Sequence, residues 1–96
     1  MSADVTDNEN LKRFELIAGK SVAFVTYNLA DGDIVLLHTE VPQELTGHGV
    51  GSKLASGIFS LIRRSGHKAV VECPFLAAWA RRHTEVADLI VKLPTR

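Results

Sequence analysis

Apolar residues at helical spacing, between two runs of β-forming residues, constrain the fold more than any other feature of the sequence. The apolar positions fall at i, i+4, i+7 and i+8 of an amphipathic helix and are Leu54, Ile58, Leu61 and Ile62. We predict that this helix ends at Ser65-Gly66, because glycine commonly follows the last turn of a helix. The β-forming runs are residues 34–41 and 69–73. Two strands joined through a helix favour a parallel βαβ unit.

The amino-terminal part of the chain predicts antiparallel strands. Residues 13–16 alternate in polarity, and residues 22–27 are rich in β-branched and aromatic side chains. Gly19 marks a turn between these two strands, and Asp31-Gly32 marks the turn that leads into the third. The predicted fold class is therefore α/β (α+β), a mixed sheet in which antiparallel amino-terminal strands precede one βαβ unit.

The two ends of the chain differ in character. Residues 1–10 are polar and acidic, so we expect a disordered leader followed by one domain over residues 11–96. Beyond the strand at 69–73 we predict a second helix to about His83 and a short third helix after a Thr84 cap. Val86, Leu89 and Ile90 suit this third helix. Four large apolar residues have the spacing of a packed core and are Phe59, Phe75, Leu76 and Trp79.

Composition restricts the partners of a chain this short. Its 96 residues carry eleven basic and eleven acidic side chains, which argues against a nucleic-acid or membrane-surface binder held by bulk charge. Residues 1–50 hold three basic and eight acidic side chains and residues 51–96 the reverse, so an anionic ligand is expected at the second half. The single cysteine, Cys73, excludes an internal disulfide, and we find neither a secretory leader nor a membrane span. We expect a cytoplasmic protein, monomeric or weakly homodimeric.

Three glycines, Gly47, Gly49 and Gly51, alternate where the third strand leads into the long helix. Glycine lets backbone N–H groups approach a ligand without a Cβ in the way, and the amino end of a helix attracts phosphate. A tight strand-to-helix turn is the alternative. The order Gly51-Ser52-Lys53 does not fit a P-loop, in which lysine precedes the serine or threonine. A dinucleotide fingerprint is disfavoured because the third glycine comes one residue early and a second βαβ half is missing.

Short motifs occur in order between residues 12 and 91 and carry a resemblance. They are His38-Thr39-Glu40-Val41-Pro42, Gly47-His48-Gly49-Val50-Gly51-Ser52, Cys73-Pro74-Phe75, and Trp79 with Arg82-His83. The segment Glu44-Leu45-Thr46-Gly47-His48-Gly49 matches the GNAT acetyltransferase pattern Gln/Arg-x-x-Gly-x-Gly/Ala apart from Glu44. The chain therefore resembles the small single-domain GNAT-like N-acetyltransferase family, the GCN5-related N-acetyltransferases. Glu44 departs from the pattern, because an acid near a pyrophosphate is unfavourable unless its side chain points to solvent.

The resemblance implies a truncated GNAT fold that binds acetyl-CoA. The strands at 34–41 and 69–73 are then expected to separate, with pantetheine between them and pyrophosphate on the glycine segment. The amides of pantetheine can pair with exposed backbone like an added strand. The implied cofactor-binding residues are Thr39, Val41, Gly47, His48, Gly49, Val50, Gly51 and Ser52. Basic side chains that either reach the adenosine phosphate or form solvated helix faces are Arg63, Arg64, Lys68, Arg81 and Arg82.

Three residues, Cys73, Glu40 and His38, are the candidates for catalysis. The Cys73 thiol is either a small buried hydrophobe or, as the resemblance implies, the group that protonates the departing CoA thiolate or attacks the thioester. His38 and Glu40 are two residues apart on one strand face, and either can take the proton of an incoming ammonium. His83 is a further candidate. Tyr27 lies in the amino-terminal hairpin, so the tyrosine acid of many GNAT enzymes is missing.

The predicted function is transfer of an acetyl group from acetyl-CoA to an amine that the sequence does not identify. The histidines lack the spacing of zinc ligands, so no metal is expected. The expected partners are acetyl-CoA and the amine, with no nucleic acid and no membrane. The alternative is a non-catalytic module that binds CoA or another protein and retains the fold.

Overall fold

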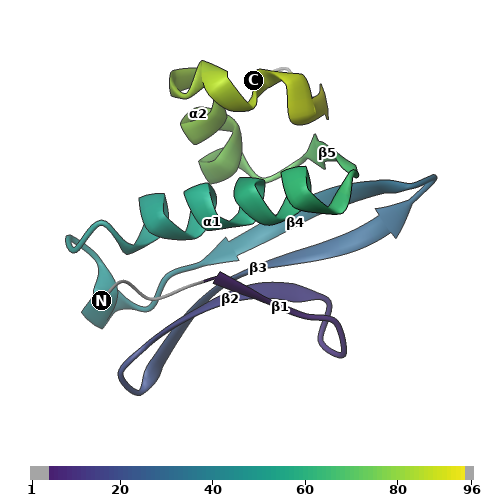
Figure 1. The fold of residues 1–96 in the computed structure, drawn as a ribbon. Helices are drawn as coiled ribbons and strands as arrows, with labels where there is room; N and C mark the ends of the chain where they lie inside the picture. The colour runs from purple at the N-terminus through teal and green to yellow at the C-terminus, as the bar shows by residue number, and fades with distance from the viewer. Residues whose placement is uncertain (1–4, 95–96) are drawn as a thin grey trace.

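A computed structural model describes residues 5–94, which form a six-stranded mixed sheet in the order β1-β2-β3-β4-β5-β6 (Figure 1). The first four strands pair antiparallel, whereas β4–β5 and β5–β6 pair parallel. The predicted mixed sheet is confirmed. The elements in chain order are β1 (Val5–Asn8), β2 (Arg13–Ala18), β3 (Ser21–Ala30), β4 (Asp33–Glu40), the 3-10 helix η1 (Gln43–Leu45), α1 (Val50–Ser65), β5 (Lys68–Val71), α2 (Pro74–Arg82), the 3-10 helix η2 (Thr84–Leu89) and β6 (Ile90–Lys92).

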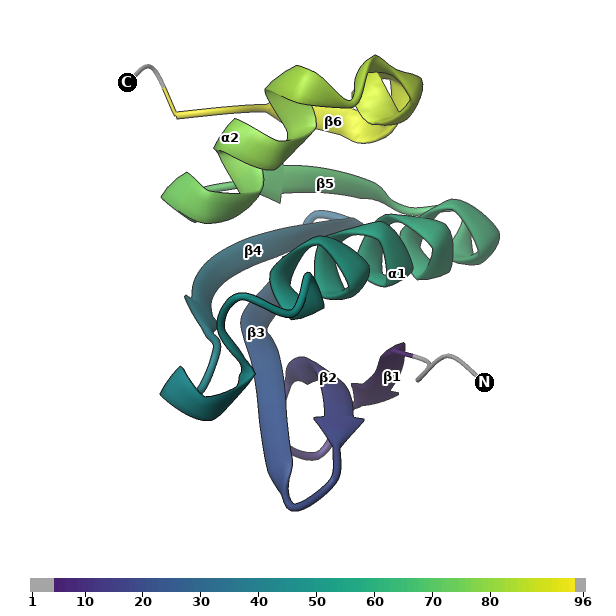
Figure 2. The same cartoon turned by 90° about the vertical axis from the view of Figure 1, so that its left-hand side faces the viewer.

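Both α-helices cover the same face of the sheet. In Figure 2, strands β3 to β6 follow one another from bottom to top. The crossovers β4–α1–β5 and β5–α2–β6 each lead to the next parallel strand in that direction. Because such crossovers are right-handed, both helices lie on one side of the sheet. Phe59 of α1 and Trp79 of α2 stack with ring centroids 5.7 Å apart. The buried residues between helices and sheet include Phe14, Leu16, Val25, Leu36, Leu54, Ile58, Phe59, Ile62, Val71, Leu76 and Trp79.

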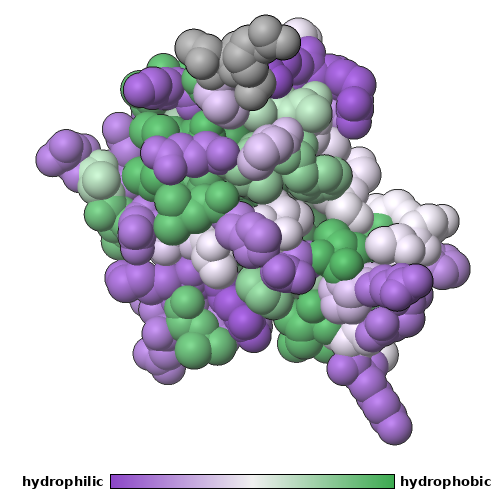
Figure 3. All heavy atoms as spheres, turned by 180° about the vertical axis from the view of Figure 1, so that it is seen from behind, coloured by the Kyte–Doolittle hydropathy of each residue, from purple (hydrophilic) through white to green (hydrophobic). Residues whose placement is uncertain are grey.

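No helix of the described residues covers the other face of the sheet. Seen from behind, hydrophobic and hydrophilic residues are interspersed over the surface (Figure 3). Ile17 and Leu37 are exposed, and Phe24 is half-buried beneath the guanidinium of Arg13, whose Cζ lies 4.2 Å from the ring centroid. No helix in the part of the chain that the structure describes is long and apolar enough to span a membrane.

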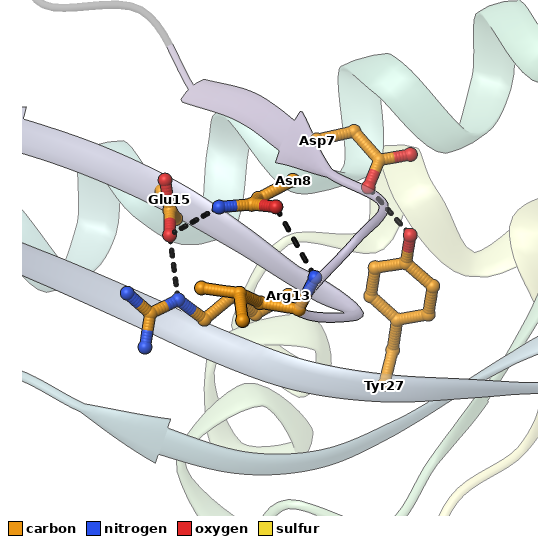
Figure 4. A network of polar contacts seen from close by, with 6 residues as sticks. Asp7, Asn8, Arg13, Glu15 and Tyr27 are labelled. Carbon is orange, nitrogen blue, oxygen red and sulfur yellow. Dashed lines mark hydrogen bonds and ion pairs between the residues drawn. The ribbon is translucent and has the colours of Figure 1, made fainter.

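The predicted disordered leader over residues 1–10 is wrong for residues 5–10, and residues 1–4 lie outside the described residues. Val5–Asn8 form β1 and pair antiparallel with β2. Asp7 accepts a hydrogen bond from the Tyr27 hydroxyl at 2.5 Å, and Asn8 donates to Glu15 at 3.1 Å (Figure 4). These tertiary contacts compensate for the few apolar residues of β1, which is why polarity alone mispredicts it.

The carboxyl-terminal end also differs from the prediction. The short third helix is the 3-10 helix η2, and Ile90 begins β6 instead of continuing it. No side chain caps η2, so the Thr84 cap is wrong. Phe75 was expected in the core but is 38% exposed, because it lies in the first turn of α2 at the edge of the helical layer. Trp79 and Leu76 are buried as predicted.

Candidate active site

The parallel strands β4 and β5 separate halfway along β4. Their pairing runs from Asp33↔Lys68 to Leu36↔Val71, and the Glu72 N–H donates to the Leu36 carbonyl at 2.9 Å. Beyond Leu36, β4 continues for four more residues beside β3, while the chain after β5 turns into α2 at Pro74. Proline is favoured in the first turn of a helix, where its missing N–H has no partner to lose. This divergence of β4 and β5 beyond Leu36 and Val71, called the opening from here on, corresponds to the separation that the resemblance implied.

A bulge in β4 decides which side chains face this opening. Tyr27 pairs with Leu36 and Thr26 with His38, so Leu37 is an extra residue on β4. A bulge of one residue exchanges the two faces of the strand beyond it. Thr39 is therefore on the helix-covered face with its partner Val25, although regular alternation from the buried Leu36 predicts the opposite face.

Thr39 and Cys73 meet at the base of the opening. Their Oγ1 and Sγ atoms form a hydrogen bond of 2.7 Å. Cys73 is 2% exposed and is the residue immediately before α2, where its carbonyl accepts a hydrogen bond from the Ala77 N–H at 2.9 Å. The structure thus brings together one predicted catalytic residue and one predicted cofactor-binding residue.

His38 and Glu40 lie on the opposite face of β4 from Thr39. Their side chains are exposed and pair with each other, with Nε2 of His38 2.8 Å from Oε2 of Glu40. The structure therefore does not bring them onto the same side as Cys73. Because β4 has no β5 partner at these positions, the His38–Glu40 pair borders the opening from the uncovered face of the sheet.

The amino end of α1 lies in the glycine segment. Gly49 precedes the helix in the left-handed conformation, with φ 72°, and Gly47 has φ 84°. No side chain caps the helix, and its first bond runs from the Lys53 N–H to the Gly49 carbonyl at 3.1 Å. The N–H groups of Val50, Gly51 and Ser52 therefore have no acceptor within α1. Such a turn offers several donors to an anion.

Two aromatic residues of α2 contact this turn, and the sequence argument assigned both only to the core. The ring of Phe75 lies over Gly51, so a Cβ at Gly51 would be 2.8 Å from Cζ of Phe75. The indole N–H of Trp79 donates to Oγ of Ser52 at 3.1 Å. Both residues occur within the ordered motifs of the sequence, and this was the signal that could have placed them near the glycine segment.

Glu44, which departs from the GNAT pattern, is exposed in η1. It accepts a hydrogen bond from the Ser21 hydroxyl at the start of β3. This bond holds the pKa of Glu44 below its usual value. The carboxylate is thus engaged with the β2–β3 hairpin.

Most of the basic candidates for the adenosine phosphate have other contacts. Arg63 forms a two-pronged ion pair with Asp88, at 2.9 and 3.0 Å, which raises the Arg63 pKa. It also lies about 21 Å along the axis of α1 from Gly49. Lys68 donates to the Asp88 carbonyl and Arg81 to the Pro94 carbonyl, each at 2.8 Å. His83 is stacked on Trp79 and donates to its carbonyl.

A cavity of about 690 Å³ lies at the other end of the sheet. Its lining includes Tyr27, Ile34 and Arg64, and Ile34 is about 17 Å along β4 from Thr39. The Tyr27 hydroxyl is occupied by Asp7 there, so it is not an acid for the opening. The described residues contain no group of three or more side chains arranged to hold a metal ion.

The fold and the opening define an acetyltransferase-like α+β domain. A GCN5-like protein from Staphylococcus aureus, solved by NMR, has a similar structure, with a TM-score of 0.71 and 24% identity over 99% of this chain and 94% of that one. No match was found among the curated proteins. The family model "GCN5-related N-acetyl-transferase" matches residues 13–89. The chain belongs to the GCN5-related N-acetyltransferase family, and membership supports a general role in acetyl transfer.

Proposed function

We propose that the protein transfers an acetyl group from acetyl-CoA to an amine. The observation that carries the proposal is the juxtaposition of the opening between β4 and β5 with the uncapped amino end of α1. The opening suits the extended amide chain of pantetheine, and the amino end of α1 suits the pyrophosphate.

Acetyl-CoA binding is supported by the polar groups that line this region. Backbone groups at Thr39 and Val41, which lie beyond the β4–β5 pairing, are available to the amides of pantetheine. The N–H groups of Val50, Gly51 and Ser52 suit the pyrophosphate, while Gly47, His48 and Gly49 form the turn that leads to them. The thioester then lies near the Thr39–Cys73 pair.

The chemistry requires two proton movements. A neutral amine attacks the thioester carbonyl, the new C–N bond forms, and the C–S bond breaks to release CoA as a thiolate. First, Glu40 or His38 accepts the proton of the incoming ammonium from the uncovered face. Second, Cys73 gives its proton to the thiolate and regains one from the nitrogen of the new amide, so that the amine proton ends on CoA. Direct transfer is the simplest route. The alternative route forms an acetyl-Cys73 thioester first and passes the acetyl group to the amine second.

A titration and a turnover assay test the proposal together. Calorimetry with acetyl-CoA measures binding, and release of free thiol in the presence of polyamines, peptides and small amines measures transfer. We expect saturable binding and amine-dependent thiol release. Binding without release for every amine would support a non-catalytic CoA-binding module, and absence of binding would overturn the proposal. Intact mass after mixing with acetyl-CoA separates the two routes, because only the covalent one adds an acetyl group that amine removes.

A further inference from the structure

We propose that Trp79 is a positioning residue for the pyrophosphate of acetyl-CoA. Its indole N–H holds the Ser52 side chain so that the Ser52 hydroxyl donates its own proton into the anion site at the start of α1. This inference rests on the proposed function, because the anion concerned is the CoA pyrophosphate. It assigns a role in ligand binding to a residue whose ring is part of the core.

The contact joins a buried ring to an exposed hydroxyl. Trp79 is 4% exposed, and its Nε1 lies 3.1 Å from Oγ of Ser52. Ser52 is exposed in the first turn of α1, next to the N–H groups of Val50 and Gly51. The bond therefore connects α2 with the turn of α1 that offers donors to an anion.

Packing fixes the direction of the indole N–H. The ring is stacked with Phe59, with centroids 5.7 Å apart, and with His83, with centroids 3.8 Å apart, and each pair is within 8° of parallel. Nδ1 of His83 donates to the Trp79 carbonyl at 2.8 Å, which holds the imidazole against the indole. A buried ring stacked with two aromatic neighbours cannot turn its N–H away from Ser52 without repacking.

The chemistry of a hydroxyl explains the consequence. A serine hydroxyl has one proton to donate and two lone pairs to accept. Trp79 occupies a lone pair, and no residue in the range 5–94 accepts the Ser52 proton, whereas serine in a helix commonly bonds the carbonyl four residues earlier. The proton is thus available to a phosphate oxygen. Without the indole, rotation of Ser52 toward the His48 carbonyl removes that donor.

Two matched substitutions test this role. Trp79→Phe keeps an aromatic ring and removes the N–H together with part of the ring volume, and Ser52→Ala removes the hydroxyl. We expect each to raise the KM for acetyl-CoA about fivefold, the effect of one hydrogen bond, with kcat unchanged. The double variant should equal Ser52→Ala, because Trp79 acts through Ser52. Neither variant should change the KM for S-acetyl-pantetheine, which lacks the pyrophosphate.

Fluorescence supplies a readout that a purely structural role does not move. Trp79 is the single tryptophan of the chain, so tryptophan emission reports the surroundings of this indole. We expect CoA to change the emission of the wild-type protein and of Ser52→Thr, which retains the hydroxyl. Ser52→Ala should lose that response while calorimetry still detects CoA binding. Should Trp79→Phe fail to fold, this comparison of Ser52→Ala with Ser52→Thr decides.

The outcomes separate the two proposals. A wild-type protein that does not bind CoA overturns the proposed function and, with it, the role of Trp79. A wild-type protein that binds CoA, together with a folded Trp79→Phe variant of unchanged KM, overturns the role of Trp79 alone. Three further results would overturn the role of Trp79. They are additive effects of the two substitutions on KM, an equal rise in the KM for S-acetyl-pantetheine, and an equal change of emission with CoA in Ser52→Ala and Ser52→Thr.

Discussion

The hydroxyl of Thr39 and the thiol of Cys73 lie 2.7 Å apart at the point where β4 and β5 separate. One residue lies on a strand and the other immediately before a helix, and they are 34 positions apart in the chain. Their contact joins the two segments just beyond the last paired residues, Leu36 and Val71. It also allows Cys73 to exchange a proton with a hydroxyl instead of being surrounded only by apolar side chains.

Replacement of Cys73 by serine separates chemistry from packing. Cys73→Ser nearly preserves size and the hydrogen bond with Thr39, but a hydroxyl ionises far less readily than a thiol. We expect acetyl-CoA turnover to fall about 100-fold with little change in Tm, measured by thiol release and thermal denaturation. A variant that melts early yet turns over normally would place Cys73 in the core. Thr39→Val is the control that removes only the partner hydroxyl.

Gly49 and Gly66 provide a matched pair at the two ends of α1. Both have left-handed backbones, with φ 72° and 82°, and neither has a neighbour within 4 Å of an added Cβ. A valine at either position therefore costs backbone strain of about 1–2 kcal/mol. We expect Gly49→Val to weaken CoA binding at least tenfold and Gly66→Val to leave it unchanged, as measured by calorimetry. Equal CoA affinity in the two folded variants would remove the glycine segment from the site.

Glu40 is one of the two candidates for the base, because its carboxylate borders the opening and is paired with His38. Glu40→Gln retains the shape and removes the basic oxygen. We expect kcat for acetyl transfer to fall about 100-fold while the KM for acetyl-CoA stays the same. Glu72→Gln, an exposed acid just beyond β5, is the control and should retain full activity. A fully active Glu40→Gln enzyme would show that the base lies elsewhere.

Because of the Tyr27–Asp7 hydrogen bond, we expect the free energy of unfolding to depend on pH in the alkaline range. Burial, followed by the hydrogen bond to Asp7, raises the pKa of Tyr27 above its usual value. The folded state therefore favours the protonated phenol. Its contribution is complete below the ordinary tyrosine pKa of about 10 and is lost as pH rises through the folded-state pKa.

Urea denaturation between pH 8 and pH 11 checks this dependence. We expect Tyr27→Phe to lower the free energy of unfolding by about 1 kcal/mol at neutral pH and the difference from wild type to shrink above about pH 10. CoA affinity at neutral pH should not change, because the Tyr27 hydroxyl is bonded to Asp7 of β1 and does not contact the opening. A difference that grows with pH would contradict the assigned bond.

Gly57 allows β1 to approach α1. A Cβ at this position would lie 2.7 Å from Cβ of Val5, closer than side chains can pack. We expect Gly57→Ala to lower the free energy of unfolding by about 1–3 kcal/mol through overpacking, and the double variant Val5→Ala/Gly57→Ala to recover part of it. Full stability of the single variant would show that β1 is not held against the helix.

Local signals made much of the fold predictable. Asp31-Gly32 forms the expected hairpin turn with both residues at positive φ, and Gly66 ends α1 in the left-handed conformation. These features depend on the backbone preferences of a few adjacent residues. Gly49 likewise marks the start of α1, so the position of the candidate anion site could be predicted from the sequence.

Other features depend on partners that are distant in the chain. The sequence by itself determined the strands β2 to β5, the amphipathic α1 and the turns, because these follow from local conformation and from the period of apolar residues. Only the tertiary structure decided that Thr39 and not His38 faces Cys73, because a bulge at Leu37 changes the face of every later residue and exists only through pairing with β3. It likewise decided that Trp79 is bonded to Ser52, because a buried indole N–H takes whichever partner packing brings within reach.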